Sequence, residues 1–148
     1  MVTWLLDTNV LLYLANPAAL QHDAASRAVM RILADGGRLT VAAQVLFEFW
    51  SVATRPASAN GLGWTVAQTH LAIDGFRTRF FVLEETPEVV DLWLDLVVSN
   101  ALKGKRIHDA HLLATMQANG VTHLLTFNTA DFPPGAGLTH PPSRDALP

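Results

Sequence analysis

Four acidic side chains occupy positions where they could bind a metal ion. They are Asp7, Glu48, Asp109 and Asp131. Carboxylate oxygens suit Mg²⁺ or Mn²⁺, ions that keep several waters and bridge phosphate oxygens. Two such ions can activate an attacking water and stabilise the leaving oxygen of a phosphodiester. The chain has 0 Cys, so any metal must use oxygen or imidazole ligands. We therefore treat these four residues as candidate catalytic residues and metal ligands.

The surroundings of Asp7 and Glu48 favour function over a purely structural role. Asp7 follows the apolar run 4–6, at the end of an expected buried strand where a carboxylate loses solvation. It could instead cap the helix that begins there. Glu48 lies in an expected helix with apolar residues on every side, and glutamate is rarely buried without a partner. The alternative for Glu48 is a single surface position on that helix.

Asp109 and Asp131 have stronger structural alternatives. Asp109 lies in the first turn of an expected helix, where the helix dipole alone favours an acid. Its spacing from Leu112 and Met116 directs it towards the side of the core residues. Asp131 and Asn128 follow an apolar run, where Asp and Asn are common turn residues. A functional role for Asp109 and Asp131 is favoured only by their position in the fold.

Short apolar runs alternate with segments of helical periodicity, which predicts an α/β fold. Strands are expected at residues 2–6, 39–42, 80–83 and 123–127. Helices are expected from residue 8 to about 16 and at 23–35, 43–54, 65–77, 87–97 and 107–119. The fold class is a three-layer sandwich, with a parallel sheet of four to five strands and helices on both faces. A small edge strand is expected near Leu138 in a largely irregular tail, 133–148.

The same architecture predicts that the four acids converge. Ligands of parallel sheets bind at the carboxyl ends of the strands. Asp7 and Asp131 each follow a strand, whereas Glu48 and Asp109 lie in early turns of helices that follow strands or loops at the same edge of the sheet. A single crevice lined by carboxylates is therefore expected.

Length and composition indicate one domain, 1–148, that associates with other proteins. At 148 residues the chain has the size of a single domain. Hydrophobic residues make up 50% of it and charged ones 16%, which favours self-association or a protein partner through an apolar face. Trp50, Trp64 and Phe76 are the aromatic residues expected on that face. No apolar run approaches the ~20 residues that span a bilayer, so we expect no membrane association and a cytoplasmic location.

The net charge of −3 neither supports nor excludes a nucleic-acid substrate. If the four candidate ligands are set aside, the 10 basic residues slightly outnumber the acids that remain of the 13. Lys103, Lys105 and Arg106 form a dense basic cluster shortly before Asp109. These three side chains could hold a phosphate backbone, although a solvated loop is the structural alternative.

The ordered set of motifs resembles the PIN-domain nucleases, and in particular the VapC-type toxins of toxin-antitoxin pairs, over nearly the whole chain. The motifs are Asp7-Thr8-Asn9, Glu48, Arg106-Ile107-His108-Asp109-Ala110, and Thr126-Phe127-Asn128 with Asp131-Phe132. The resemblance implies a Mg²⁺- or Mn²⁺-dependent endoribonuclease that forms a homodimer and is inhibited by an antitoxin. It also implies that Thr8 and Asn9 orient the first acid or contact phosphate and water. Some relatives have an acid where this chain has Asn128, so Asn128 is given a supporting role.

Three other readings remain open from the sequence. A haloacid dehalogenase-like phosphatase would use Asp7 as its nucleophile, but it wants a second acid at Asn9 and leaves Glu48 unexplained. His108 and His111 share a helix face and could bind zinc, although no third ligand is evident. Finally, the acids could belong to a binding module without catalytic activity.

Overall fold

A parallel four-stranded sheet forms the centre of the computed structural model, which describes residues 1–128. Its strands are β1 (Thr3–Leu6), β2 (Arg38–Val41), β3 (Phe81–Val82) and β4 (His123–Leu125). They lie in the order β3-β2-β1-β4, and each neighbouring pair is parallel. The central pair is β1 and β2, in which Leu5 is aligned with Thr40. The predicted α/β class is confirmed.

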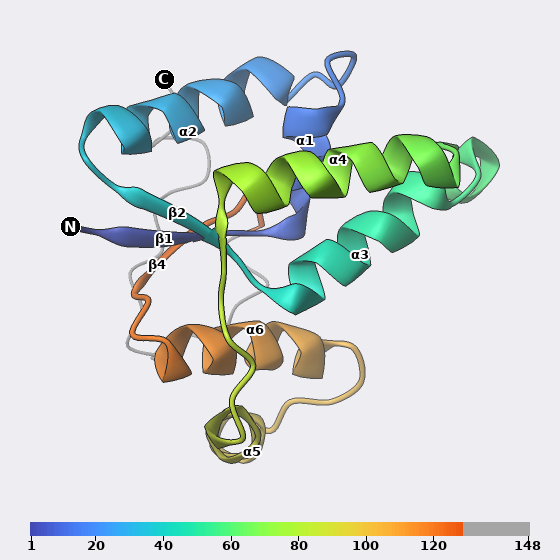
Figure 1. Cartoon of the computed structure of the whole chain (residues 1–148). Coiled ribbons are helices and arrows are strands. Elements are labelled where there is room, and N and C mark those ends of the chain that lie inside the picture. Colours follow the sequence, from blue (N-terminus) through green and yellow to red (C-terminus); the bar gives the residue numbers. More distant parts are fainter. Residues whose placement is uncertain (129–148) are drawn as a thin grey trace.

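Helices cover both faces of this sheet, as predicted (Figure 1). They are α1 (Thr8–Ala15), α2 (His22–Ala34), α3 (Ala43–Thr54), α4 (Val66–Arg79), α5 (Glu88–Ser99) and α6 (Arg106–Ala118), with a short 3-10 turn at Ala57–Ala59. In Figure 1, α1, α2 and α4 lie on one side of the sheet, and α6 lies on the other. Helix α5 packs against α6 on its outer side.

Local sequence signals set several helix boundaries. Helix α3 has the predicted limits, Ala43 and Thr54, and ends shortly before Pro56. Thr65 with Gln68 three residues later predicts a capping box at the start of α4. This prediction is confirmed: Thr65 Oγ1 accepts from the Gln68 N–H at 3.1 Å, and Gln68 Oε1 accepts from the Thr65 N–H at 2.9 Å. Thr86 followed by Pro87 predicts a side-chain cap at Thr86. This prediction is wrong, because α5 begins at Glu88 and its cap residue, Pro87, makes no side-chain hydrogen bond. The Thr86 backbone carbonyl instead accepts from Val89 N–H at 3.0 Å.

Two strands are shorter than predicted, for identifiable reasons. Phe80 ends α4, since its N–H donates to Phe76 O at 2.8 Å. Strand β4 stops at Leu125, because the next N–H groups leave the ladder: Phe127 N–H donates to the Asn9 side chain at 3.2 Å. The segment 133–148, which is expected to be largely irregular, and the strand expected near Leu138 lie outside the described residues.

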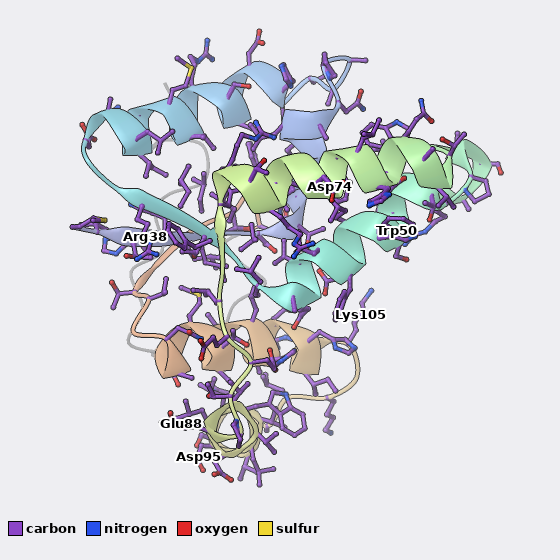
Figure 2. The ribbon with its side chains drawn as sticks, viewed as in Figure 1. Arg38, Trp50, Asp74, Glu88, Asp95 and Lys105 are labelled. Carbon is purple, nitrogen blue, oxygen red and sulfur yellow. The ribbon has the colours of Figure 1, made fainter. Side chains whose placement is uncertain are left out.

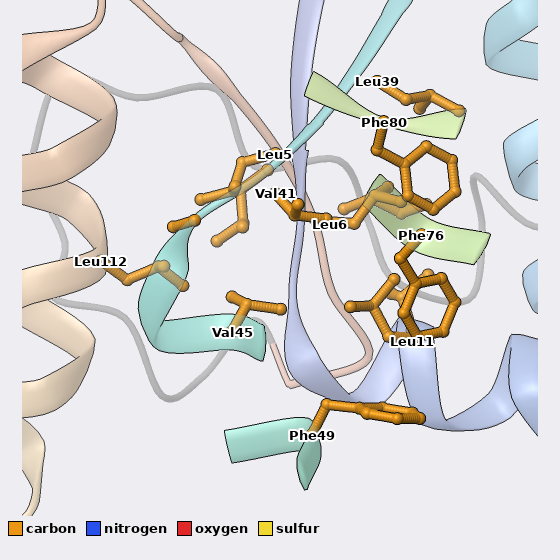
Figure 3. Packing of buried hydrophobic residues seen from close by; sticks show 14 of the residues in the cluster. Leu5, Leu6, Leu11, Leu39, Val41, Val45, Phe49, Phe76, Phe80 and Leu112 are labelled. Atoms are coloured by element: carbon orange, nitrogen blue, oxygen red, sulfur yellow. The ribbon is translucent and has the colours of Figure 1, made fainter. Parts of the chain in front are cut away.

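One hydrophobic core spans both sides of the sheet. In Figure 3, Leu112 of α6 approaches from one side of the strands, whereas Phe76 and Phe80 lie on the other. Phe49 of α3 meets Phe76 edge-on, with ring centroids 5.0 Å apart. Such aromatic pairs stabilise a core beyond the area that they bury. This packing fixes the carboxyl ends of β1 and β4 relative to α3.

The aromatic residues predicted on an exposed apolar face do not form one. Phe76 is only 1% exposed, because α4 turns it towards Phe49 and Phe80. Trp50 and Trp64 are half-buried. Large apolar side chains are nevertheless exposed on several helices and on β3, among them Phe47, Leu71, Phe81, Val90, Leu94 and Val98. No helix within residues 1–128 is both long enough and apolar enough to cross a membrane.

Candidate active site

Asp7 leaves the carboxyl end of β1 and immediately caps α1. Its Oδ1 atom accepts from Thr8 N–H at 2.8 Å, and its own N–H donates to Leu125 O of β4 at 3.0 Å. The structural alternative, a helix cap, is therefore correct as far as it goes. It does not exclude a functional role, because the second carboxylate oxygen, Oδ2, faces a separate set of polar groups.

That second oxygen is held by side chains from β4 and α1. Thr126, which follows β4, donates its hydroxyl to Asp7 Oδ2 at 2.7 Å. Asn9 Nδ2 donates weakly to the same oxygen at 3.5 Å and to Thr126 Oγ1 at 3.3 Å. Asn9 Oδ1 accepts from Phe127 N–H, which ties α1 to the end of β4. Asn9 thus contacts Asp7 and Thr126, and its role in a catalytic site stays a prediction.

Thr8 connects Asp7 to Glu48. Its N–H donates to Asp7, and its hydroxyl donates to Glu48 Oε2 at 2.7 Å. Thr8 is only 8% exposed, whereas Glu48 is half-buried on α3. Although α3 has apolar residues on every side, it is not enclosed, since Phe47 is 72% exposed. Two carboxylates distant in sequence are thus brought to one threonine.

Asp109 lies in the first turn of α6, as predicted, and is half-buried. The residue before it, His108, accepts a hydrogen bond through its carbonyl from Gln44 Nε2 at 2.9 Å. Gln44 also donates to Glu48 Oε1 at 2.9 Å. The start of α6 is therefore tied to the helix that carries Glu48.

Asp131 lies outside the described residues. Asn128 is exposed, and its backbone N–H donates to Thr126 Oγ1 at 3.0 Å.

Within residues 1–128, no three His, Cys, Asp or Glu side chains are close enough to form a complete metal site. The donor chemistry of Asp7 and Glu48 nevertheless fits Mg²⁺ or Mn²⁺. Within residues 1–128, the side chains and the backbone N–H that donate hydrogen bonds to these oxygens include hydroxyls and amides, which are uncharged groups. A hard cation can be held by one or two carboxylates together with several waters.

The zinc alternative receives no support from this part of the chain. The Nε2 atom of His111 lies in hydrogen-bonding contact with Glu85 Oε1, and His108 is exposed. Neither belongs to a group of three potential ligands within the described range.

The basic cluster lies beside the start of α6 and is fully on the surface: Lys103, Lys105 and Arg106 are all exposed. Figure 2 shows Lys105 at this loop, near the beginning of α3 in the view.

Sequence reasoning missed the roles of Thr126 and Gln44. Thr126 was part of a motif, but nothing in its spacing showed that it would donate to Asp7. Gln44 stands one helical turn before Glu48, so the pair has the spacing at which side chains on a helix meet. That spacing was the available signal.

Comparison with known proteins identifies the fold family. The model of the family described as "PIN domain" matches residues 4–133. The chain belongs to the PIN-domain family. A curated relative, Ribonuclease VapC24 of Mycobacterium tuberculosis, is 31% identical over 137 residues, covering 86% of this chain and 87% of the relative. The resemblance inferred from the motifs is confirmed, and the dehalogenase-like alternative loses its basis.

Solved structures with this fold include VapBC2 from Rickettsia felis bound to a promoter DNA fragment, with a TM-score of 0.69 at 17% identity, covering 95% of this chain and 98% of that one. M. tuberculosis VapC20, described as a Sarcin-Ricin loop cleaving toxin, has a TM-score of 0.66 at 18% identity, and the match covers 92% of this chain and 96% of VapC20. VapBC-1 from nontypeable Haemophilus influenzae has a TM-score of 0.67 at 19% identity, and the match covers 96% of this chain and 98% of that one. At these identities the likeness establishes the shared fold.

Proposed function

We propose that this PIN-domain protein is a Mg²⁺- or Mn²⁺-dependent endoribonuclease that acts as the toxin of a toxin-antitoxin pair. The observation that carries the proposal is the bridge through Thr8, which joins the carboxylates of Asp7 and Glu48 at the carboxyl edge of the sheet. The family match and the curated relative named as a ribonuclease support the same conclusion.

In this proposal Asp7 and Glu48 hold the divalent ion, and Asp109 and Asp131 complete the set of acids. When bound, the ion activates the attacking water and offsets charge on the phosphate. The chain's own residues orient the ligands: Thr126 fixes Asp7 Oδ2, and Thr8 holds Glu48 Oε2. Such preorganisation matters, because only correctly placed charges stabilise the transition state without further rearrangement.

Metal removal tests the activity directly. Purified protein with a structured RNA is expected to cut the RNA in Mg²⁺ or Mn²⁺, and EDTA is expected to abolish cleavage. The ion should also raise the midpoint of thermal unfolding, because a ligand that binds only the folded state stabilises it. A phosphatase substrate in the same buffer should not be hydrolysed. RNA cleavage that persists unchanged in EDTA would contradict the proposal.

The basic cluster, Lys103, Lys105 and Arg106, is proposed to contact the RNA backbone. Changing all three to Ala should weaken RNA binding across sequences. It should also reduce the slope of log K against log salt by roughly 0.7–0.9 per lost phosphate contact. Binding measured at several salt concentrations checks this, with Arg27→Ala/Arg31→Ala on α2 as a control that also removes exposed charge. An unchanged slope in the triple variant would place the RNA elsewhere.

The proposed partners are an antitoxin protein and a second copy of the chain. Structural neighbours include toxin-antitoxin complexes, and the described surface exposes several large apolar side chains. Light scattering of the isolated protein at micromolar concentration should give the mass of a dimer. A monomer under these conditions would contradict self-association.

A further inference from the structure

Gln44 makes an unusual pair of hydrogen bonds at the start of α3. Its Nε2 atom lies 2.9 Å from Glu48 Oε1 and 2.9 Å from the backbone carbonyl of His108. Both partners can only accept, the one as a carboxylate and the other as a carbonyl. The amide nitrogen must therefore face both, and the orientation of the Gln44 amide follows from its partners.

This orientation leaves the other end of the amide without a partner. Gln44 Oε1 is buried and accepts no hydrogen bond in the described part of the chain. A buried acceptor that has lost its water costs stability, which a simple apolar side chain at this position would avoid. Glu48, in contrast, is half-buried and His108 is exposed. Water can therefore reach both residues if the amide is removed. Fold stability alone does not account for a glutamine here.

The two bonds connect the helices that carry two of the candidate ligands. Gln44 and Glu48 belong to α3, and His108 directly precedes Asp109 in the first turn of α6. Helix α6 packs mainly against α5, on the opposite side of the sheet from α4. The shared amide therefore fixes one Glu48 oxygen at a set distance from the start of α6, while Thr8 fixes the other.

We propose that Gln44 is a positioning residue, whose single amide group sets the Glu48 carboxylate against the first turn of α6 and thereby sets the affinity for the divalent ion. This inference rests on the proposed function of the site. Gln44 acts through Glu48 and needs no contact with the substrate. Groups that orient metal ligands in this way typically change metal affinity or activity by ~10–100-fold when they are removed.

The first test is Gln44→Met, which keeps the length of the side chain and removes the amide. Mn²⁺ affinity measured by calorimetry should fall by about 10-fold or more. The unfolding midpoint of the metal-free protein should stay the same or rise, because the unpartnered oxygen is gone. Gln21→Met is the matched control: Gln21 is also half-buried, but it precedes α2 and makes no side-chain cap there. It should leave both quantities unchanged.

Two further measurements separate positioning from folding. Gln44→Asn keeps an amide but is too short to reach both acceptors, and it should also weaken Mn²⁺ binding. In a Glu48→Gln background, Gln44→Met should have almost no additional effect on Mn²⁺ affinity, since coupled residues are not additive. The proposal is supported if both variants bind Mn²⁺ more weakly than the wild type and if Gln44→Met causes no such reduction in the Glu48→Gln background.

Other outcomes overturn one proposal or the other. If the wild type binds Mn²⁺ and cuts RNA, and Gln44→Met or Gln44→Asn binds Mn²⁺ equally well, Gln44 has no positioning role. A loss of metal-free stability with unchanged Mn²⁺ affinity would likewise show a purely structural residue. If the wild type neither binds Mn²⁺ nor cuts RNA, the proposed function fails, and the inference about Gln44 fails with it.

Discussion

Asp7→Asn is expected to reduce RNA cleavage at least ~100-fold, because losing a ligand of the ion that activates water removes several kcal/mol of transition-state stabilisation. The change keeps the shape of the side chain and an oxygen that can still accept from Thr8 N–H, so α1 retains its cap. The amide that replaces Oδ2 can donate to Thr126 Oγ1, although the Thr126 hydroxyl then loses Oδ2 as its acceptor. The fold should therefore survive, and activity should be the property that is lost.

The same variant should separate binding of the metal from stability of the fold. Asp7 and Glu48 are negatively charged neighbours of Thr8, and like charges in proximity disfavour the folded state when no cation is present. Metal-free Asp7→Asn should thus be at least as stable as the wild type. Added Mg²⁺ or Mn²⁺ should raise the unfolding midpoint of the wild type strongly and that of the variant only slightly.

The control for Asp7→Asn is Asp23→Asn, which removes an exposed acid from the first turn of α2. It should leave cleavage and the response to metal unchanged. If Asp7→Asn instead lowers the stability of the metal-free protein and leaves cleavage and the metal response intact, Asp7 serves as a helix cap and the proposed site is wrong.

Much of the fold could be predicted because local signals decide it. The run before Asp7 is apolar enough for a buried strand, and Leu5 and Leu6 are indeed fully buried in β1. Helix α3 and the capping box at Thr65 follow from periodicity and from the chemistry of helix ends. The parallel pairing follows from the alternation of strands and helices, whereas the strand order β3-β2-β1-β4 does not.

Side-chain exposure could not be predicted in the same way. Phe76 is expected from the sequence on an exposed apolar face, yet its ring packs edge-on to Phe49 and is stacked with Phe80. Which face of a helix is covered depends on the helices that lie against it, and those contacts are distant in sequence. Phe47 shows the opposite case, because it is exposed on a helix that has apolar residues on every side.

The candidate site divides in a similar manner. Asp7, Glu48 and Asp109 could be proposed from residue type and position, since charged groups beside buried segments are uncommon without a purpose. The hydrogen bonds of Gln44 and Thr126 could not, because each joins elements that meet only in the folded chain: α3 with α6, and the end of β4 with α1. Residues that orient ligands carry weaker sequence signals than the ligands themselves.

Thr126→Val should test whether this orienting network matters as much as the acids. Thr126 is 0% exposed, so bulk water cannot take over the hydrogen bonds of its hydroxyl when that hydroxyl is removed. It donates to Asp7 Oδ2 at 2.7 Å and accepts from Asn128 N–H at 3.0 Å. Valine has nearly the same shape but can do neither. Leaving such groups without partners costs about 1–3 kcal/mol each when they are buried.

We expect Thr126→Val to lower the free energy of unfolding by about 2 kcal/mol, since Asn128 is exposed and its N–H can be rehydrated. Cleavage by the folded protein should fall by ~10–100-fold, because Asp7 loses the group that fixes its second oxygen. Thr126→Ser is the matched control: it removes a methyl group and keeps the hydroxyl, so it should retain most of the activity and lose stability only through reduced packing. Denaturant unfolding and single-turnover cleavage of one RNA, measured on all three proteins, separate the two effects. Equal cleavage by the Val and Ser variants would show that the Thr126 hydroxyl supports the fold and leaves the placement of Asp7 to Thr8 and Asn9.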